Sequence, residues 1–600
     1  MVKLNTFKVL KNLPFQMHLL SDPSIKKMLR EFDFYGVRFY REERAKEPTV
    51  CLDYPAGNVY WFIDFKKSIE ETVLKKENYY ESEWKALLSA LKSRIKSEFE
   101  SLSQTLNHIS PKDVVAKMNQ YNLRDYQAFD LLQLTVKMCQ TEVPAGLILS
   151  EQRTGKTRVA VAAIDEMMPS GGCVIVICPK SAVSGWIEEF QEMDRFQGHG
   201  KGHFRQIKVY KHMREIHEPE TSTGHYAIKI ITYDLFKRFT TAQLRKATYA
   251  AYSDVMLVCD EVHRLRNFKT LQSDILYRFK DSCFKDKVNL RILGITGTPA
   301  IKSSSDIFGI FSLINTSKIG FQPYIKDFNQ FKEYFYNCED TSYGKICKTL
   351  KRTHELNFLI QSSSVQTKQR DLPMFANYEK KSISVSLTMD EEQAKIYQSV
   401  RDTFIFEDSI DCANGLVQLI RLQQICIDPS SLVSSYDLLA PKIKWMLGYA
   451  KTKDVKTIVM AKKLTALDAV AKVFDENCIA YSYLKGALSV SARKTEVDKF
   501  RTDPDVKFFL IQLDAGREAL TLPEASCTIF LDRDFAQGFN EQAEARMTPI
   551  DGVAHTKYVI DLIMRDTVEE EIYNILVIRK ENIDNVNSLK EIYKKGGLIP

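Results

Sequence analysis

The sequence predicts an α/β protein built on parallel sheets, and three observations support this fold class. Short, almost wholly apolar runs recur along the chain, such as residues 173–178 (Cys-Val-Ile-Val-Ile-Cys) and 255–259 (Val-Met-Leu-Val-Cys). Helical patterns separate these runs, which is typical of βα units whose sheet is covered on both faces. Polar side chains gather directly after the runs, where the carboxyl ends of parallel strands form ligand sites.

Residues 147–157 (Leu-Ile-Leu-Ser-Glu-Gln-Arg-Thr-Gly-Lys-Thr) have the order strand, turn, Gly-Lys-Thr and helix that is typical of a phosphate-binding loop. Backbone N–H groups of such a loop face the phosphates, its lysine reaches the outer phosphates, and its threonine hydroxyl holds Mg²⁺. The alternative is an ordinary turn with a chance Gly-Lys-Thr, because many such loops have glycine at the position of the arginine. The residues assigned to ATP in this loop are Arg153, Thr154, Gly155, Lys156 and Thr157.

The pair Asp260–Glu261 follows the apolar run 255–259 directly. A carboxylate at a strand end can hold Mg²⁺, and the adjacent carboxylate can orient or deprotonate the attacking water. A solvated turn is the alternative for an isolated Asp-Glu pair. Because this pair ends a buried run downstream of a phosphate loop, we assign Asp260 to Mg²⁺, together with Thr157, and Glu261 to catalysis.

The composition bounds the class of protein. Six hundred residues are enough for about four domains, and a formal charge of +7 means that any anion-binding surface must be local. The twelve cysteines form no Cys-x-x-Cys pair, which favours buried thiols in a reducing compartment over disulfides or a zinc site. No apolar run approaches the roughly 20 residues that span a bilayer. We therefore expect a cytoplasmic protein without a membrane segment.

The N-terminal residues 1–112 predict a small α+β accessory domain of unknown role. Residues 49–54 and 59–64 read as two strands of a hairpin around Pro-Ala-Gly-Asn. Residues 81–102 keep apolar side chains at helical spacing, and the lysines on the other faces are typical of a solvated helix rather than of a DNA-binding one.

Five motifs, in this order, resemble the first motor lobe of superfamily 2 nucleic-acid translocases. Two of them, the pattern of Pro179 and Lys180 with Trp186 and Glu189 and the pair Thr232-Tyr233, are most similar to the Swi/Snf-like branch, which acts on double-stranded DNA. The motifs are Gly155-Lys156-Thr157, Cys178-Pro-Lys-Ser181 with Trp186 and Glu189, Thr232-Tyr233, Asp260-Glu-Val-His263 and Thr296-Gly-Thr-Pro299.

Later blocks are similar to the second lobe of the same branch. They include Leu484-Lys-Gly486, Ala515-Gly-Arg-Glu-Ala-Leu-Thr-Leu522 and Gln542-Ala-Glu-Ala-Arg546. The resemblance implies two RecA-like parallel-sheet lobes with helical insertions, beside the accessory domain. The expected boundaries are 1–112 for the accessory domain, 113–320 for the first lobe, 321–440 for helical insertions and the inter-lobe linker, 441–583 for the second lobe and 584–600 for a C-terminal tail.

The resemblance also implies site residues, ATP and Mg²⁺ as cofactors, and double-stranded DNA as partner. The implied catalytic residues are Lys156, Asp260, Glu261, Gln542 and Arg546. Further ATP contacts are Arg124 and Gln127, which can read the adenine edge, and Gly516. The candidate DNA contacts, each of which could equally be an ordinary strand-end or loop residue, are Lys180, Thr232, Tyr233, Lys485 and Thr521.

The second lobe departs from the family pattern in two places. Pro549 stands where a second arginine usually follows Arg546, so Arg546 acts alone, Arg517 or Arg533 substitutes, or the motor is slow. An arginine at the γ-phosphate is worth roughly 10³ to 10⁵ in rate. Ala519 and Thr521 also replace the small and Asn residues that are common in the family.

The expected function is ATP-driven translocation on double-stranded DNA that remodels DNA or bound complexes. Two alternatives stay open, a strand-separating DNA or RNA helicase and a weakly hydrolysing protein that binds nucleotide and DNA. The compact motor would suit a virus-encoded or bacterial member, associated with the nucleoid or acting in host cytoplasm.

Overall fold

The computed structural model places the chain in two compact units. The first comprises Met1–Pro299, Ser305–Thr367 and Asn585–Pro600, and the second comprises Ala300–Ser304 and Lys368–Asp584. The structure describes residues 4–584 except for 9–15, 18, 20, 33–37, 43–48, 56–59, 72–79, 108, 140–143, 198–206, 213–214, 216–225, 248–251, 298–305, 315–326, 342–343, 353–355, 357–359, 408, 413–414, 486–489, 514–521, 536 and 550–554.

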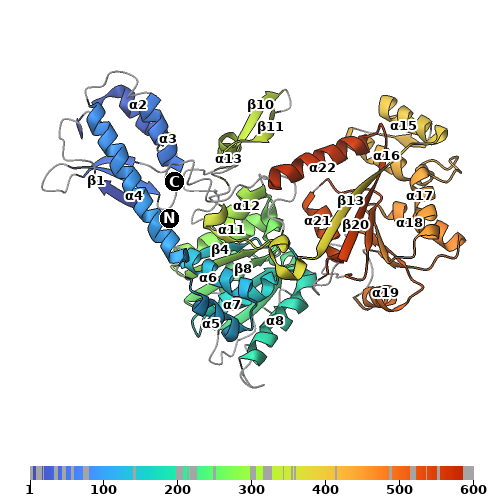
Figure 1. Ribbon diagram of the computed structural model, residues 1–600, viewed down its shortest axis with the longest axis horizontal. Helices are drawn as coiled ribbons and strands as arrows, with labels where there is room; N and C mark the ends of the chain where they lie inside the picture. The colour runs from blue at the N-terminus through green and yellow to red at the C-terminus, as the bar shows by residue number, and fades with distance from the viewer. Residues whose placement is uncertain are drawn as a thin grey trace. The chain divides into compact units, whose positions relative to one another are not determined.

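A sheet of seven parallel strands forms the centre of the first unit (Figure 1). The order is β12 (Ser364–Val365), β4 (Ala145–Ile148), β9 (Asn289–Ile295), β8 (Asp254–Asp260), β5 (Cys173–Cys178), β7 (Ala227–Thr232) and β6 (Ile207–Tyr210). Alternate residues of these strands enter two different hydrophobic clusters, with Val176 in one and Ile177 in the other. Both faces of the sheet are therefore buried, as the continuous apolar runs predict.

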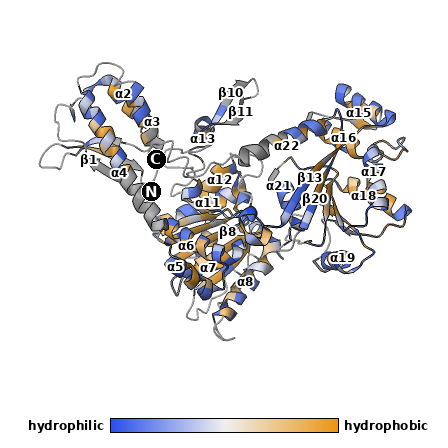
Figure 2. Ribbon diagram, in the orientation of Figure 1, coloured by the Kyte–Doolittle hydropathy of each residue, from blue (hydrophilic) through white to orange (hydrophobic). Residues whose placement is uncertain are grey.

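Two sets of helices cover these faces. One face packs on α6 (Asp125–Cys139), α7 (Lys156–Met167) and α8 (Val183–Phe196), with α5 (Pro111–Tyr121) beside them. The other packs on α9 (Tyr233–Phe236), α10 (Thr241–Ala247), α11 (Leu271–Lys285), α12 (Ile307–Ile314) and α13 (Phe328–Phe335). Figure 2 shows hydrophobic residues concentrated around β4, β8 and the helices that flank them. Short 3₁₀ turns, η3 (Lys180–Ala182) and η5 (Val262–Leu265), follow β5 and β8.

The N-terminal part contains both helices and strands, and the prediction of a strand over residues 59–64 is wrong. Its antiparallel sheet has the order β1 (Leu4–Lys8), β3 (Thr49–Pro55) and β2 (Arg38–Glu42). The predicted second hairpin strand is instead the start of helix α3 (Tyr60–Ile69), because Phe62, Phe65 and Ile69 are buried at helical spacing. The remaining helices are α2 (Pro23–Phe32) and α4 (Glu81–Asn107), and α4 confirms the helix expected over 81–102.

A sheet of six parallel strands forms the centre of the second unit. The order is β13 (Tyr378–Leu387), β20 (His555–Met564), β19 (Cys527–Phe530), β16 (Thr457–Ala461), β18 (Phe508–Gln512) and β17 (Tyr481–Leu484). One face packs on α15 (Glu391–Thr403), α16 (Gly415–Ile427), α17 (Pro441–Thr452) and α18 (Leu464–Glu476). The other packs on α19 (Val490–Thr502), α21 (Gln537–Glu544) and the 3₁₀ turn η10 (Ala545–Met547), and α22 (Val568–Asp584) ends the described chain.

The segment 321–440, which the sequence predicts to be helical, contributes strands to both sheets. Residues 364–365 form β12 at the edge of the first sheet, and β13 pairs with β20 along its whole length. The run Ser-Ile-Ser-Val-Ser-Leu at 382–387 alternates with a period of two, which is a strand pattern, so its assignment to a helical insertion is wrong. Other strands here are β10 (Tyr336–Thr341) with β11 (Gly344–Leu350), and β14 (Ile405–Phe406) with β15 (Ile410–Asp411).

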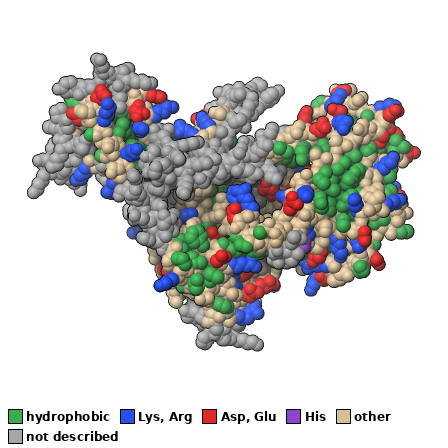
Figure 3. Space-filling view, in the orientation of Figure 1, with side chains coloured by type: hydrophobic (Ala, Val, Ile, Leu, Met, Phe, Trp, Pro, Cys, Tyr) green, Lys and Arg blue, Asp and Glu red, His purple; other side chains and the backbone are tan. Residues whose placement is uncertain are grey.

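The cysteine assignment agrees with the structure. Cys173, Cys178, Cys259 and Cys527 are free and buried. Within the described ranges, no helix combines the length and the apolar character that crossing a bilayer requires. Figure 3 shows lysine, arginine, aspartate and glutamate side chains interspersed on the visible face of the second unit, as expected from the modest net charge.

Candidate nucleotide site

The phosphate-binding loop lies between β4 and α7 in the first unit. Gly155 precedes α7 with φ of +78°, and a Cβ at this position would lie 2.1 Å from Nε2 of Gln127. Both its backbone conformation and this contact require glycine. Arg153 adopts φ of +62°, the left-handed conformation that a residue with Cβ rarely takes. The arginine therefore keeps a backbone for which glycine would be better suited.

Helix α6 holds the loop through Gln127. Its Nε2 donates to the Thr154 carbonyl at 3.1 Å, and its Oε1 accepts from the Arg124 N–H at 3.0 Å. The Thr154 hydroxyl in turn donates to the Glu151 carbonyl at 2.9 Å. Gln127, one of the two predicted adenine contacts, thus forms hydrogen bonds to backbone groups through both its amide nitrogen and its amide oxygen. Arg124, the other predicted adenine contact, is exposed.

Lys156 reaches back over the loop. Its Nζ donates to the Glu151 carbonyl at 3.0 Å, and a Cβ added to Gly297 would lie 3.1 Å from the same nitrogen. Burial lowers the pKa of Lys156, and the nearby carboxylates of Glu261 and Asp260 oppose that shift. The loop lysine and the two acidic residues therefore share one site at the carboxyl edge of the sheet.

Asp260 is held by three hydrogen bonds at the end of β8. Its Oδ2 accepts from Nε1 of Trp186 at 2.9 Å, and its Oδ1 accepts from the Glu261 N–H at 2.9 Å. The Tyr233 hydroxyl donates to the Asp260 carbonyl at 2.8 Å. Trp186 and Tyr233 are each 1% exposed. The contact between Trp186 and Asp260 joins residues far apart in sequence, so no local pattern could predict it.

Glu261 belongs to a second cluster that joins the ends of β8 and β9. Its backbone is left-handed, with φ of +48°. Its Oε2 accepts from the Thr296 hydroxyl at 3.2 Å and lies 3.1 Å from Nδ1 of His263. His263 Nδ1 also lies 2.9 Å from the Thr296 hydroxyl. The sequence motifs contain His263 and Thr296, but their spacing did not indicate that both contact the predicted catalytic carboxylate.

The two acidic residues have different electrostatic environments. Burial and the adjacent Glu261 carboxylate raise the pKa of Asp260 above its usual range, against the lowering effect of the Trp186 hydrogen bond. Burial also raises the pKa of Glu261, but hydrogen bonding from His263 and the charge of Lys156 outweigh it and lower the pKa overall. Glu261 is therefore the more readily ionised member of the pair.

The chain leaves the first unit directly beside the phosphate loop. The Glu151 N–H donates to the Thr367 carbonyl at 2.9 Å, and the Thr367 N–H donates to Oγ of Ser150 at 3.0 Å. The Thr367 hydroxyl donates to Oδ2 of Asp130 at 2.6 Å. Since Lys368 is the first residue of the second unit on this side, the connection begins at the loop itself.

The second unit carries the other predicted catalytic residues. Gln542 lies in α21 and is buried, and Arg546 lies in η10 and is half-buried. Arg533, one of the proposed substitutes for the missing arginine, pairs with Asp561 and Glu544 and has a side chain only 12% exposed. It therefore presents no available guanidinium to a nucleotide. Arg517, the other substitute, lies outside the described residues, as does the ATP candidate Gly516.

The DNA candidates divide into four groups. Lys180 is exposed after β5, and Lys485 is exposed after β17 with an ion pair to Asp468 at 3.0 Å. Thr232 caps α9 by accepting from the Leu235 N–H. Tyr233 is buried, and its hydroxyl donates to the Asp260 carbonyl, so the structure does not place it with the exposed candidates. Thr521 lies outside the described residues.

Comparison with known protein families identifies the family to which the chain belongs. The sequence model of the SNF2-related domain matches residues 59–431, more than half of the chain, and that of the helicase conserved C-terminal domain matches 441–548. The chain belongs to the SNF2-related family. It is accordingly an ATPase of helicase superfamily 2 that uses ATP, and its two sheets are the two RecA-like lobes that the sequence predicts.

The curated relatives that match this chain are distant in sequence. Chromodomain-helicase-DNA-binding protein 1-like of Danio rerio is 24% identical over 493 residues, which cover 78% of this chain and 44% of that protein. DNA repair and recombination protein RAD54-like of Drosophila pseudoobscura pseudoobscura is 22% identical over 510 residues, with coverages of 75% and 62%. The chain thus spans about half the length of the curated relatives it matches.

Among solved structures, the Sulfolobus solfataricus SWI2/SNF2 ATPase core in complex with dsDNA is similar to this chain at 20% identity. The match covers 79% of this chain and 97% of that one, with a TM-score of 0.33.

Proposed function

We propose that this chain is an ATP-driven motor that moves along double-stranded DNA and remodels DNA or the complexes bound to it. The observation that carries the proposal is the convergence of Lys156, Asp260 and Glu261 at the carboxyl edge of the first sheet, in a chain of the SNF2-related family. Because the relatives named above act in DNA repair or bear DNA-binding names, double-stranded DNA is the partner we favour.

The residues of the first lobe suit a magnesium nucleotide. The Thr157 hydroxyl and the Asp260 carboxylate are oxygen donors, the ligand type that Mg²⁺ prefers, and Trp186 fixes the orientation of the carboxylate. When bound there, Mg²⁺ supplies charge neutralisation at the β- and γ-phosphates. The loop N–H groups and Lys156 bind the phosphates. Glu261, which its lowered pKa keeps ionised at neutral pH, orients the attacking water and accepts its proton in the proposed mechanism.

The second lobe completes the proposed mechanism. Gln542 and Arg546 are proposed to face the nucleotide when the lobes close, with Arg546 stabilising charge that develops on the γ-phosphate. Closure with ATP and opening after hydrolysis form a two-state cycle. If each lobe grips backbone phosphates, the cycle moves the protein along DNA without reading its sequence.

Trp186→Phe tests whether the indole hydrogen bond positions Asp260. Loss of the bond at 2.9 Å leaves a buried carboxylate less well oriented, and such outer-shell changes cost about 10- to 100-fold in metal affinity. The Mg²⁺ concentration for half-maximal ATP hydrolysis should rise by that factor. Trp445→Phe, in which the tryptophan stacks on Tyr449, is the matched control. An unchanged Mg²⁺ midpoint in Trp186→Phe would refute the positioning role.

The lysine candidates make a separate prediction about salt. Each phosphate contact contributes a slope of about −0.9 in a plot of log affinity against log salt. Replacing exposed Lys180 and Lys485 together with alanine should therefore weaken duplex binding and flatten the slope by about 2. Lys451→Ala, an exposed lysine at the end of α17, is the control. If log affinity falls with log salt at the same slope in the double variant as in the wild type, neither lysine contacts phosphate.

ATP hydrolysis in the presence of different nucleic acids tests the proposed function. The wild type is measured without nucleic acid and with single-stranded DNA, double-stranded DNA or RNA. We expect the largest stimulation by duplex DNA. Stimulation only by single strands or RNA would indicate a strand-separating helicase, and turnover that stays negligible throughout would indicate a nucleotide- and DNA-binding protein on a motor fold.

A further inference from the structure

Three largely buried charged side chains, Arg533, Asp561 and Glu544, form a cluster in the second unit, and the more exposed Lys380 joins it. Arg533, which follows β19, donates to Asp561 of β20 from Nε at 2.5 Å and from Nη2 at 2.9 Å. Its Nη1 donates to Oε1 of Glu544 at the end of α21, at 2.5 Å. Lys380 of β13 donates from Nζ to the other oxygen of Glu544 at 2.7 Å. Two cations and two anions therefore balance in one network.

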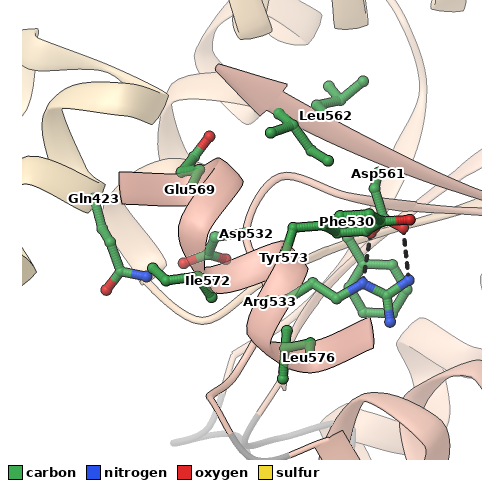
Figure 4. Close-up of a pocket in the computed structure, with 11 residues that line it drawn as sticks. Gln423, Phe530, Asp532, Arg533, Asp561, Leu562, Glu569, Ile572, Tyr573 and Leu576 are labelled. Carbon is green, nitrogen blue, oxygen red and sulfur yellow. Dashed lines mark hydrogen bonds and ion pairs between the residues drawn. The ribbon is translucent and has the colours of Figure 1, made fainter. Parts of the chain in front are cut away.

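Every part of the Arg533 guanidinium is used within this unit. Its ring-facing side lies 4.1 Å from the centroid of Phe530, and its nitrogens donate to the two carboxylates. Figure 4 shows Arg533 turned toward Asp561, with both hydrogen bonds drawn. A small pocket lined by Phe530, Arg533 and Tyr573 adjoins the cluster.

The charges of this cluster persist at neutral pH. Burial raises the pKa of Glu544, but the charges of Arg533 and Lys380 outweigh it and hold the pKa at about 2. A buried pair of this kind is weak evidence for added stability, since a well-packed apolar replacement can be as stable. The cluster contributes more by fixing the positions of the elements that it joins. Glu544 ends α21, so the fixed segment is the one that carries Gln542 and Arg546.

Glu544 lies between the two predicted catalytic residues of this lobe. Residues rotate by about 100° each along α21 and by about 120° each along the 3₁₀ turn η10, so position 544 lies roughly opposite position 542 and about 120° from position 546. The anchor at Glu544 therefore holds the side of α21 and η10 away from Gln542 and Arg546. The bond from Arg533 joins this segment to the end of β19 and, through Asp561, to β20, beside the bonds of Asn540 with the Asp534 backbone and of the Arg546 carbonyl with the Leu522 N–H.

We infer that Arg533 is a positioning residue for ATP hydrolysis, which acts through Glu544 to orient Gln542 and Arg546. This inference rests on the proposed function of those two residues. The need for such an anchor is greatest in this chain, because Pro549 replaces the second arginine and leaves Arg546 alone. A misplacement of one catalytic group by about 1 Å can cost about 100-fold in rate.

The test separates positioning from stability with a charge-balanced double variant. Arg533→Met leaves Glu544 and Asp561 with too little positive charge, and we expect a lower melting temperature. Arg533→Met combined with Asp561→Met removes one cation and one anion and leaves Glu544 paired with Lys380, so the melting temperature should recover. We expect kcat for ATP to stay roughly 10- to 100-fold below wild type in both variants, with KM for ATP within about twofold.

A second readout does not depend on turnover. Hydrogen exchange of the amides in α21 and η10 should accelerate in the double variant, while the amides of α18, on the other face of the sheet, should be unchanged. The matched control is the surface pair Arg501–Glu524, 3.5 Å apart, in which the double change to methionine should leave exchange, kcat and melting temperature unaltered.

The outcomes separate failure of the inference from failure of the proposed function. If the double variant recovers both melting temperature and kcat, the cluster is only structural and the inference is wrong. If the wild type does not hydrolyse ATP, the proposed function fails, and unchanged exchange in α21 would then overturn the positioning role as well. If Arg546→Ala and Gln542→Ala both hydrolyse ATP at the wild-type rate, Arg533 has no catalytic group to position.

Discussion

Arg546→Ala should lower the DNA-stimulated kcat for ATP by about 10³- to 10⁵-fold, the effect of removing an arginine that stabilises charge on the γ-phosphate. The effect should lie at the upper end, because Pro549 leaves no arginine three positions later and Arg533 is occupied by Asp561 and Glu544. KM for ATP should change little, since the first lobe supplies most contacts to the ground state.

The measurement is steady-state turnover with saturating duplex DNA, and Arg501→Ala serves as an arginine control on the surface of the same unit. Binding of a fluorescent ATP analogue shows that the site is intact. A decrease of less than about tenfold in kcat would mean that another group supplies the charge, and Arg517 would be the next residue to replace.

Glu261→Gln should be the second large effect, lowering kcat by about 10²- to 10⁴-fold, the usual contribution of a positioned general base. Glutamine keeps the size and the contact with Thr296 but cannot accept the proton of the attacking water. Nucleotide binding should be retained, because Lys156 and the loop N–H groups are unchanged.

Glu524→Gln, which changes a partly exposed glutamate of the second unit, is the control for this variant. Single-turnover experiments with preformed complex separate the chemical step from binding. If Glu261→Gln retains wild-type kcat, the proton acceptor lies elsewhere and Asp260, whose pKa is raised, becomes the candidate.

The sequence predicted the phosphate loop and both sheets because their signals are local. The run 173–178 is apolar throughout and is buried on both faces in the structure, and Asp260 does end a central strand. The left-handed backbone at Gly155 could also be predicted, since the turn before α7 needs a conformation that glycine adopts readily. Arg153 adopts that type of backbone without being glycine, which explains why the motif was imperfect.

Features that depend on distant contacts could not be predicted. The family resemblance implies a DNA contact for Tyr233, whereas the fold turns its hydroxyl toward the Asp260 carbonyl. Trp186 was noted only as part of a family pattern, and its bond to Asp260 appears only once α8 is placed. The residues of β13 alternate clearly, yet their position between helical blocks led to the wrong assignment.

Displacement of the third strand from a DNA triplex tests the central claim most directly, because a motor that moves along duplex DNA removes that strand without separating the duplex. We predict ATP-dependent displacement by the wild type, none by Lys156→Ala, and no separation of the underlying duplex. ATP hydrolysis that duplex DNA stimulates, without any displacement of the third strand, would contradict translocation.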